Sequence, residues 1–397
     1  MARSTGFALP VRASSRPGRR RLTLGLPFAL TLPTLLVVFL VIGIPLVYSL
    51  VLSLYRINML TKRWIFVGLQ NYADVLPHPD FLAALARTAY FAGVTVIGGL
   101  LLGMAMALVL NAAFPGRNVL RSVMLIPWGM APVTVGVLWG WIFDGSYGTL
   151  NALLFDLGLI EQPIAWLGDG GRAFNLVALV HVWNQAPLTA LLILAALQSM
   201  PDNLHRAARI DGAGAVERFF KITFPWLRPM LLLIMLLTTI NSIMAFDLFW
   251  TMTKGGPGTA TTVFSWLGYA YAFQLSKFGE GAAILYILTV VCLLLGWVYL
   301  KLFTATERRI SSAAPAADEV AAAALELHRG TSAAMRLIKL PPFRSRVLLS
   351  GATRRIAGRI GLALAAAFIF VWSFAPFLWL VIMSISTSAD SCGRRRH

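Results

Sequence analysis

The chain has 397 residues, of which 58% are hydrophobic and only 13% are charged, and its mean hydropathy is +0.74. Roughly a quarter of the residues in a soluble domain are charged, so this composition excludes an ordinary soluble protein and indicates an integral membrane protein. The formal net charge is +18. In a membrane protein we interpret this excess of Lys and Arg as a signal of orientation, because these residues stay on the cytoplasmic side. We expect no nucleic-acid binding, since the basic residues flank apolar segments without a zinc-finger spacing or an aromatic RNA-binding motif.

The N-terminal segment 1–27 is basic and precedes a long apolar stretch. That stretch is longer than the apolar region of a signal peptide and lacks a convincing small-residue cleavage site, so we expect a retained membrane helix that starts inside the cell. The two cysteines, Cys292 and Cys392, lie in an apolar span and near the C-terminus. They suggest neither a disulfide framework nor a metal site.

Six apolar stretches reach the length of about 20 residues that a membrane-spanning helix needs. They lie within one predicted domain, residues 28–305. The sequence therefore predicts an all-α, polytopic membrane helix bundle. The predicted spans are 28–54, 86–111, 120–143, 174–199, 226–250 and 280–304.

Basic residues gather in alternate connections of these six spans, as expected when Lys and Arg stay inside. The connection between the third and fourth spans instead carries Asp144, Asp156, Glu161 and Asp169 against one arginine. This pattern predicts a multi-pass protein of the cell membrane whose N-terminus and six-span C-terminal end are cytoplasmic. The basic residues on the predicted inner side include Arg117, Arg121, Arg206, Arg209, Arg218, Lys221, Arg228, Arg308 and Arg309.

A polar segment, 201–225, separates the fourth and fifth spans on the predicted cytoplasmic side. Asp202 is a plausible N-cap for a short helix, and Gly212 stands where that helix should end. A second short helix is predicted from Ala215 to Ile222, and Pro225 is expected to block its simple continuation. On pattern alone, an ordinary cytoplasmic loop explains the segment as well as a docking element does.

This segment resembles the EAA loop of permease subunits from binding-protein-dependent ATP-binding-cassette (ABC) importers. The resemblance implies a coupling helix that docks in a cleft of a separate ATPase subunit. This chain departs from the family at Arg206, where a Glu usually stands, so the docking role carries over but the ion pair of that Glu does not. The residues assigned to ATPase coupling are Arg206, Ala207, Ala208, Asp211, Gly212, Ala213, Phe219 and Pro225.

Two further stretches extend the resemblance from about residue 23 to about residue 305. Asn71-Tyr72 and its neighbours resemble a segment after the first span of carbohydrate-type permeases, although an aromatic interface anchor explains them equally. The run from Phe246-Asp247 to Gly255-Gly256-Pro257 resembles sugar-uptake permeases of the maltose, trehalose and glycerol-3-phosphate type. The resemblance implies a sugar or polyol phosphate as cargo. It also implies two ATPase copies, a second permease and an extracytoplasmic solute-binding protein as partners.

Polar residues lie inside the fourth and fifth spans, where they are costly and usually face the bundle or a wet cavity. A sugar needs planar amide or carboxylate groups and an aromatic face, because its hydroxyls require paired donors and acceptors. For Asn241 and Ser242, hydrogen bonding between helices is the alternative, and His181 is expected to be a satisfied bundle residue. The predicted substrate-path residues are Trp183, Asn184, Gln185, Asn241 and Asp247.

The composition changes after the core. Residues 306–359 form an Ala/Ser-rich and then basic linker, 360–385 an extra apolar helix, and 386–397 a tail. The extra helix ends in a run resembling the first membrane helix of the partner permease in the same transporters. Met335 and a basic flank precede it, so the sequence suggests a permease fused to the start of its partner and cut short, with a lineage-specific accessory helix as the alternative.

No phosphate-binding loop, His-Glu-x-x-His, Cys-x-x-Cys or Gly-x-Ser-x-Gly motif occurs. We therefore predict no catalytic residues, no metal site and no cofactor bound by this chain, with ATP hydrolysed by the partner ATPase. A self-sufficient secondary carrier remains an alternative, but it needs a coupling-ion site and an inverted repeat. A membrane-bound enzyme needs charged clusters in its interface loops, which the sequence does not show.

Overall fold

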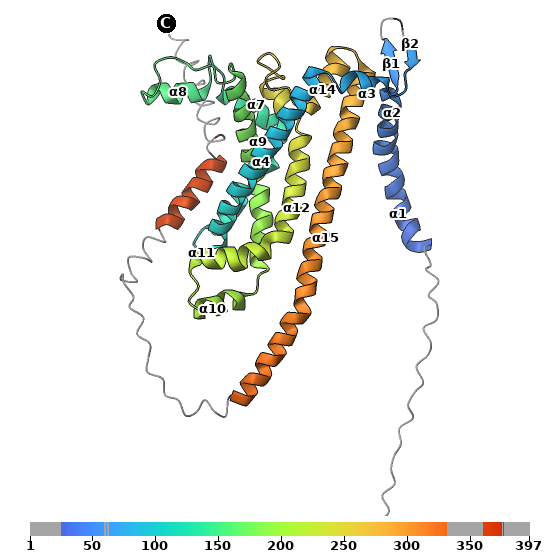
Figure 1. The fold of residues 1–397 in the computed structure, drawn as a ribbon. Coiled ribbons are helices and arrows are strands. Elements are labelled where there is room, and N and C mark those ends of the chain that lie inside the picture. The colour runs from blue at the N-terminus through green and yellow to red at the C-terminus, as the bar shows by residue number, and fades with distance from the viewer. Residues whose placement is uncertain (1–24, 59–60, 62, 332–359, 375, 377–397) are drawn as a thin grey trace, which may run out of the picture. The chain divides into compact units, whose positions relative to one another are not determined.

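The computed structural model describes residues 25–58, 61, 63–331, 360–374 and 376 (Figure 1). Apart from one two-stranded hairpin, all regular elements in these ranges are helices, which confirms the predicted all-α polytopic bundle. The chain divides into two units, Met1–Leu52 and Ser53–His397.

The described part of the first unit belongs to one apolar helical stretch. It consists of α1 (Gly25–Val38), a π-helical turn η1 (Phe39–Gly43) and α2 (Ile44–Ser53). Residues Leu30–Ser53 have the length and hydropathy of a membrane span. The π turn comes directly before Pro45, which lacks a backbone N–H. The wider turn, closed by the Ile44 N–H on the Phe39 carbonyl, lets the helix continue past the proline ring.

The second unit begins with a small hairpin joined to a short helix. Strands β1 (Tyr55–Asn58) and β2 (Arg63–Phe66) pair antiparallel, with Tyr55 opposite Phe66. Helix α3 (Gln70–Val75) follows. Its fully buried Asn71 donates hydrogen bonds to the carbonyls of Ser53 (2.7 Å) and Tyr55 (3.0 Å). Asn71 therefore satisfies the backbone at the start of the hairpin.

Four long helices form the bundle: α4 (Pro79–Asn111), α9 (Gly170–Gln198), α12 (Phe224–Ile243) and α15 (Phe278–Thr331). Helix α9 is the central one. In its apolar window 67% of the residues are buried, against 39% for α4 and 17% for the first part of α15. Helix α9 packs against α4 and α12 and also against the segments of the broken third span.

The third predicted span is broken into α5 (Arg117–Met124), α6 (Ile126–Gly129) and α7 (Pro132–Ile142). The two apolar parts meet at an angle of 92°. Prolines 127 and 132 each lack an N–H, so neither can continue the hydrogen-bond ladder of the preceding helix. The sequence predicts this break, and the structure supplies its angle.

Shorter elements close the two ends of the second unit. Helices α10 and α11 lie at one end, and α8 and α14 lie at the other (Figure 1). These elements are α8 (Thr149–Asp156), α10 (Asp202–Ile210), α11 (Ala215–Arg218), η2 (Phe219–Thr223), α13 (Asp247–Met252), α14 (Phe264–Tyr269) and η3 (Ala270–Gln274).

The chain has five helices long and apolar enough to span a membrane in its described part, or six if the broken pair counts as one span. Each coincides with a predicted span. Beyond 305, where a linker is predicted, α15 continues as helix to Thr331. The rest of that linker, most of 375–385 and the tail 386–397 lie outside the described residues. Of the predicted extra helix, Ile360–Phe374 is described, which is shorter than the about 20 residues of a full span.

Candidate coupling and substrate sites

The predicted coupling segment contains a short helix with a well-formed end. Helix α10 starts at Asp202, with Pro201 in the N-cap position, so it begins one residue earlier than the predicted Asp202 cap. At its end Gly212 has φ +80°. The N–H of Ala213 donates to the Ala208 carbonyl (2.9 Å) and that of Gly212 to the Arg209 carbonyl (3.3 Å). This is the Schellman pattern, which places glycine in the left-handed position.

The second short helix does not continue past Pro225 as a simple α-helix, but a π turn carries the helix on. Helix α11 runs into the π turn η2 and then into α12, and Ala215–Met252 is one apolar helical stretch. The Phe224 N–H reaches the Phe219 carbonyl five residues back. Pro225 therefore stands in the first turn of α12 behind a π turn, as Pro45 does behind η1, and the wider turn accommodates the missing N–H.

The structure brings the predicted coupling residues together at one end of the bundle, on α10, the turn after it, η2 and the first turn of α12. Arg206 and Ala207 are exposed, whereas Ala208 is buried. A Cβ added to Gly212 meets no atom within 4 Å, so another protein can approach this turn closely. Phe219 is half-buried and lies in η2 with Phe220 beside it.

Sequence reasoning missed the apolar side chains around this turn. Ile210 is 86% exposed, Val216 71% and Phe220 62%. Exposed apolar side chains rimmed by polar ones mark interaction sites. Their signal in the sequence is a bulky apolar residue in a segment otherwise rich in Arg, Asp and Gly.

A polar cavity of about 230 Å³ lies where α9, α12 and α13 meet. It unites four of the five predicted substrate-path residues and adds His181 and Phe246, which the prediction did not include. Its volume is below the about 300–1,000 Å³ of sites for drug-sized ligands, so in this conformation it fits a small polar solute. The lining residues are Pro132, His181, Asn184, Gln185, Asn241, Met244, Ala245, Phe246, Asp247 and Leu248.

Asn184 links this cavity to the break in the third span. Its Nδ2 donates to the Pro127 carbonyl at 2.6 Å, and its Oδ1 accepts from Gln185 Nε2 at 3.0 Å. A proline break leaves carbonyls that neighbouring helices must satisfy within a membrane. Asn184 therefore holds α6 on α9, and Gln185 presents the more available amide.

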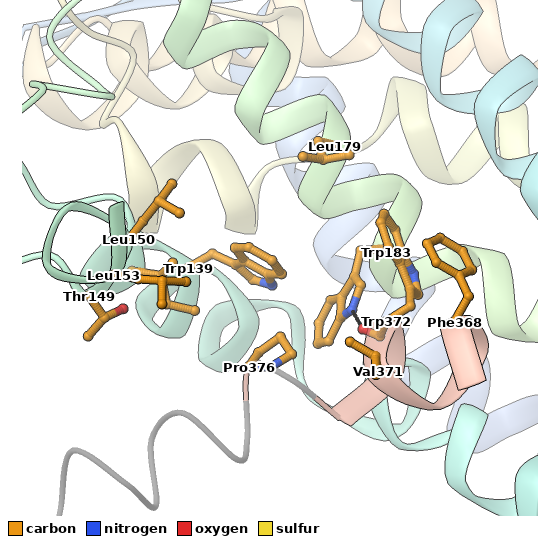
Figure 2. A pocket seen from close by; sticks show the side chains of 11 residues that line it. Trp139, Thr149, Leu150, Leu153, Leu179, Trp183, Phe368, Val371, Trp372 and Pro376 are labelled. Atoms are coloured by element: carbon orange, nitrogen blue, oxygen red, sulfur yellow. Dashed lines mark hydrogen bonds between the residues drawn. The ribbon is translucent and has the colours of Figure 1, made fainter. Parts of the chain in front are cut away.

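Trp183, the fifth predicted substrate residue, does not line the polar cavity. It is 1% exposed, and its Nε1 donates to the Trp372 carbonyl at 2.7 Å. Figure 2 shows it beside Trp139 and Leu179, facing the helix Ile360–Phe374. An apolar cavity of about 290 Å³ lies there. Successive residues of an α-helix point roughly 100° apart, so Trp183 and Asn184 serve different faces of α9.

Ser242 belongs to a hydrogen-bond chain between helices, as the alternative interpretation proposed. It is 3% exposed, accepts from Thr95 Oγ1 at 2.8 Å, and lies 3.4 Å from His181 Nε2. Asn241, its neighbour, is exposed and lines the cavity instead. The chain Thr95–Ser242–His181 thus ties α4, α12 and α9 together, and His181 at its end lines the cavity.

The aromatic ring at the cavity comes from Phe246. It stacks on Trp266 (centroids 5.8 Å apart) and on Trp250 (6.2 Å), and it packs against Tyr269 (5.1 Å). The sequence signal was its position next to Asp247 in the Phe-Asp motif. Together with the amides and the carboxylate, Phe246 gives the cavity the two kinds of surface that a sugar needs.

The comparisons with known proteins agree on one family. Residues 99–312 match the model of the family described as binding-protein-dependent transport system inner membrane component. The chain is 38% identical over 276 residues to the trehalose/maltose transport system permease protein MalF of Thermococcus litoralis, covering 70% of this chain and 92% of that protein. It is 32% identical over 303 residues to the trehalose transport system permease protein SugA of Mycobacterium tuberculosis, covering 76% and 94%.

A solved structure shares the fold. The match is to a crystal structure of a bacterial ABC transporter involved in the import of the acidic polysaccharide alginate, with a TM-score of 0.61 and 20% identity over 70% of this chain and 95% of that one. The family match covers more than half of the chain, and the relatives match over most of their length. The chain therefore belongs to the family of binding-protein-dependent transport system inner membrane components.

Proposed function

We propose that this chain is the permease subunit of an ABC importer that carries a sugar or sugar-like solute into the cytoplasm. The observation that carries the proposal is the cavity between α9, α12 and α13, where amides, one carboxylate and the ring of Phe246 face one space. The relatives MalF and SugA, named as permeases for trehalose/maltose and for trehalose, support this substrate class.

Coupling to ATP is assigned to α10 and the turn at Gly212. A separate ATPase, in two copies, would hold this segment, and a second permease and an extracytoplasmic binding protein would complete the assembly. Its exposed apolar side chains, Ile210, Val216 and Phe220, support a protein contact there. The chain itself binds no cofactor in this scheme and hydrolyses no ATP. Movement of α10 would reach the cavity through α11, η2 and α12, which are continuous.

The N-terminus is placed in the cytoplasm, on the same side as α10. The support is the basic N-terminal segment and the arginines at the α10 end of the bundle, because positive residues stay inside. Reporter fusions at the N-terminus and within 144–173 test this orientation. The first should report the cytoplasm and the second the outside, and the opposite result contradicts the assignment.

The decisive test is purification of the chain from its native membrane in mild detergent, followed by uptake assays in liposomes. We expect an ATPase with a phosphate-binding loop and a second permease to accompany the chain. Uptake of labelled trehalose or maltose should require ATP and the binding protein. A chain that purifies alone and transports without ATP would instead be a secondary carrier.

A further inference from the structure

A basic pocket of about 470 Å³ lies between the coupling segment and the bundle. One wall is the end of α4 and α9, including Asn111, and the other is formed by α10, α11 and η2. Three guanidinium groups and one imidazole line it: Arg206, Arg209, Arg218 and His205. Arg206 and Phe219 in its lining are also predicted coupling residues, but no function assigned above uses the space between the coupling segment and the bundle.

The positive charges of this pocket lack acidic partners. No carboxylate is among its lining residues, as far as side chains are described. Arg218 Nη1 donates to the Ala213 carbonyl (2.7 Å) and Arg209 Nε to the His205 carbonyl (3.2 Å). Glu217 is the nearest acid in sequence to Arg218, and it pairs instead with Lys221 at 2.7 Å. The three arginines take part in no ion pair with described residues.

Helix ends compensate only part of this charge. Helices α4 and α9 end at Asn111 and Gln198, next to the pocket, and each C-terminus carries roughly −0.5 elementary charge. The two helix ends together contribute about −1 elementary charge, whereas the three guanidinium groups contribute three positive charges. A concave site with unbalanced charge and low-dielectric walls concentrates anions. Guanidinium groups, with their planar fork of donors, match phosphate oxygens in pairs.

We propose that this pocket binds a phosphate group, with Arg206 and Arg209 as its main ligands and Arg218 completing the site. The phosphate comes either from the headgroup of an anionic lipid or from a free phosphate anion. Because the pocket is shared by the bundle and by α10, a bound phosphate ties the coupling segment to α4 and α9. The proposal does not depend on the transported solute or on the ATPase, since binding is a property of this chain alone.

The test measures thermal unfolding of the full chain at constant ionic strength, which removes general screening effects. In neutral detergent, inorganic phosphate is titrated against chloride. In a second arm, the chain is placed in nanodiscs of phosphatidylcholine alone or with phosphatidylglycerol. The pocket variants are Arg206→Gln and Arg209→Gln. They are tested separately, so that if one variant fails to fold, the other still tests the pocket. The control is Arg228→Gln, an exposed arginine at the same end of the bundle that does not line the pocket.

We expect a rise in unfolding temperature with phosphate or with phosphatidylglycerol. The response to phosphate identifies a free anion, and a response to phosphatidylglycerol alone identifies a lipid headgroup. A charge-assisted hydrogen bond contributes about 1.5–3 kcal/mol, so each pocket variant should weaken binding by about tenfold or more. Arg228→Gln should bind as the unchanged chain does.

Two results overturn the proposal. One is an equal response in the pocket variants and the control, which means general attraction to a basic surface. The other is the absence of any response in both arms. A chain without any response can still lose its ATPase subunit in Arg206→Gln and Arg209→Gln. In that case the arginines contact acidic residues of the ATPase.

Discussion

The indole of Trp183 in α9 donates its Nε1 hydrogen bond to the backbone carbonyl of Trp372 at 2.7 Å (Figure 2). This bond joins the central helix of the bundle to the C-terminal helix Ile360–Phe374. Ile369 and Ser373 of that helix are buried as well, at 2% and 0% exposure. The C-terminal helix is therefore packed on the core through its own residues, whatever the origin of this part of the chain.

Replacing Trp183 with Phe should loosen the C-terminal helix. The change removes the donor to the Trp372 carbonyl, and hydrogen bonds between membrane helices contribute about 0.6–1 kcal/mol. Unfolding in detergent should show a loss of this size in addition to the cost of the removed ring volume, and hydrogen exchange should rise within 360–374 while α4 stays protected.

The matched control for this change is Trp139→Phe. The two rings pack edge to face, 5.4 Å apart, but the Nε1 of Trp139 is buried without a hydrogen-bond partner among the described atoms. Its replacement removes the same ring volume and no hydrogen bond, so exchange in 360–374 should not change. Equal effects of both variants would show that packing, and not the hydrogen bond, holds the helix.

Asp247→Asn tests the polar cavity. Asp247 lies in the first turn of α13 and lines the cavity. If its carboxylate accepts hydrogen bonds from a sugar, losing the charge weakens them by about 1.5 kcal/mol or more, and KM for uptake should rise roughly tenfold. Thr238→Val is the control, because Thr238 bonds the Ile234 carbonyl of its own helix and does not line the cavity. An unchanged KM in Asp247→Asn removes this residue from the substrate path.

The sequence predicts the helices of this protein well because apolar length and charge asymmetry determine membrane spans directly. It predicts the cavity only in part. The prediction grouped Trp183 with Asn184 because a sugar needs an aromatic face beside planar amides, but neighbours on a helix point roughly 100° apart. Which of the two faces the cavity depends on the rotation of α9, and that is set by α4, α6 and α12.

Two further features of the structure could not be predicted from the sequence. The missing N–H of Pro225 predicts that the helix before it has no simple continuation, and the π turn η2 is the adjustment that carries the helix past Pro225. Asn184 lines the cavity, so its place on the substrate path stays a prediction, and its Nδ2 also donates to the Pro127 carbonyl 2.6 Å away. Both outcomes depend on local adjustments that a single sequence does not display.

Gly103→Val should destabilise the bundle at the contact of α4 with α9. A Cβ on Gly103 would lie 2.5 Å from Thr189 Cγ2 and 2.9 Å from its Cβ, so the helices could not keep their distance. Overpacking of this kind costs about 1–3 kcal/mol, measurable as a lower unfolding temperature in detergent. Gly99→Val is the control, because a Cβ there meets nothing within 4 Å although Gly99 is buried. Similar losses in both variants would contradict the close-contact explanation.

Gly212→Trp should abolish uptake while leaving membrane insertion intact. Gly212 has φ +80°, and its Cα faces open space at the turn after α10. A bulky ring there obstructs the close approach of an ATPase, and the residue also strains the left-handed position by about 1 kcal/mol. The strain alone is small compared with a complete loss of transport, so the two effects can be separated.

Gly116→Trp separates them. Gly116 has φ +85° and equally open surroundings, but it caps the start of α5 instead of α10. The strain is therefore matched, and only the position differs. We expect Gly116→Trp to retain ATP-dependent uptake and to co-purify with the ATPase, whereas Gly212→Trp loses both. Full transport by Gly212→Trp would refute the assignment of α10 and its turn to ATPase docking, and loss in both variants would attribute the effect to backbone strain.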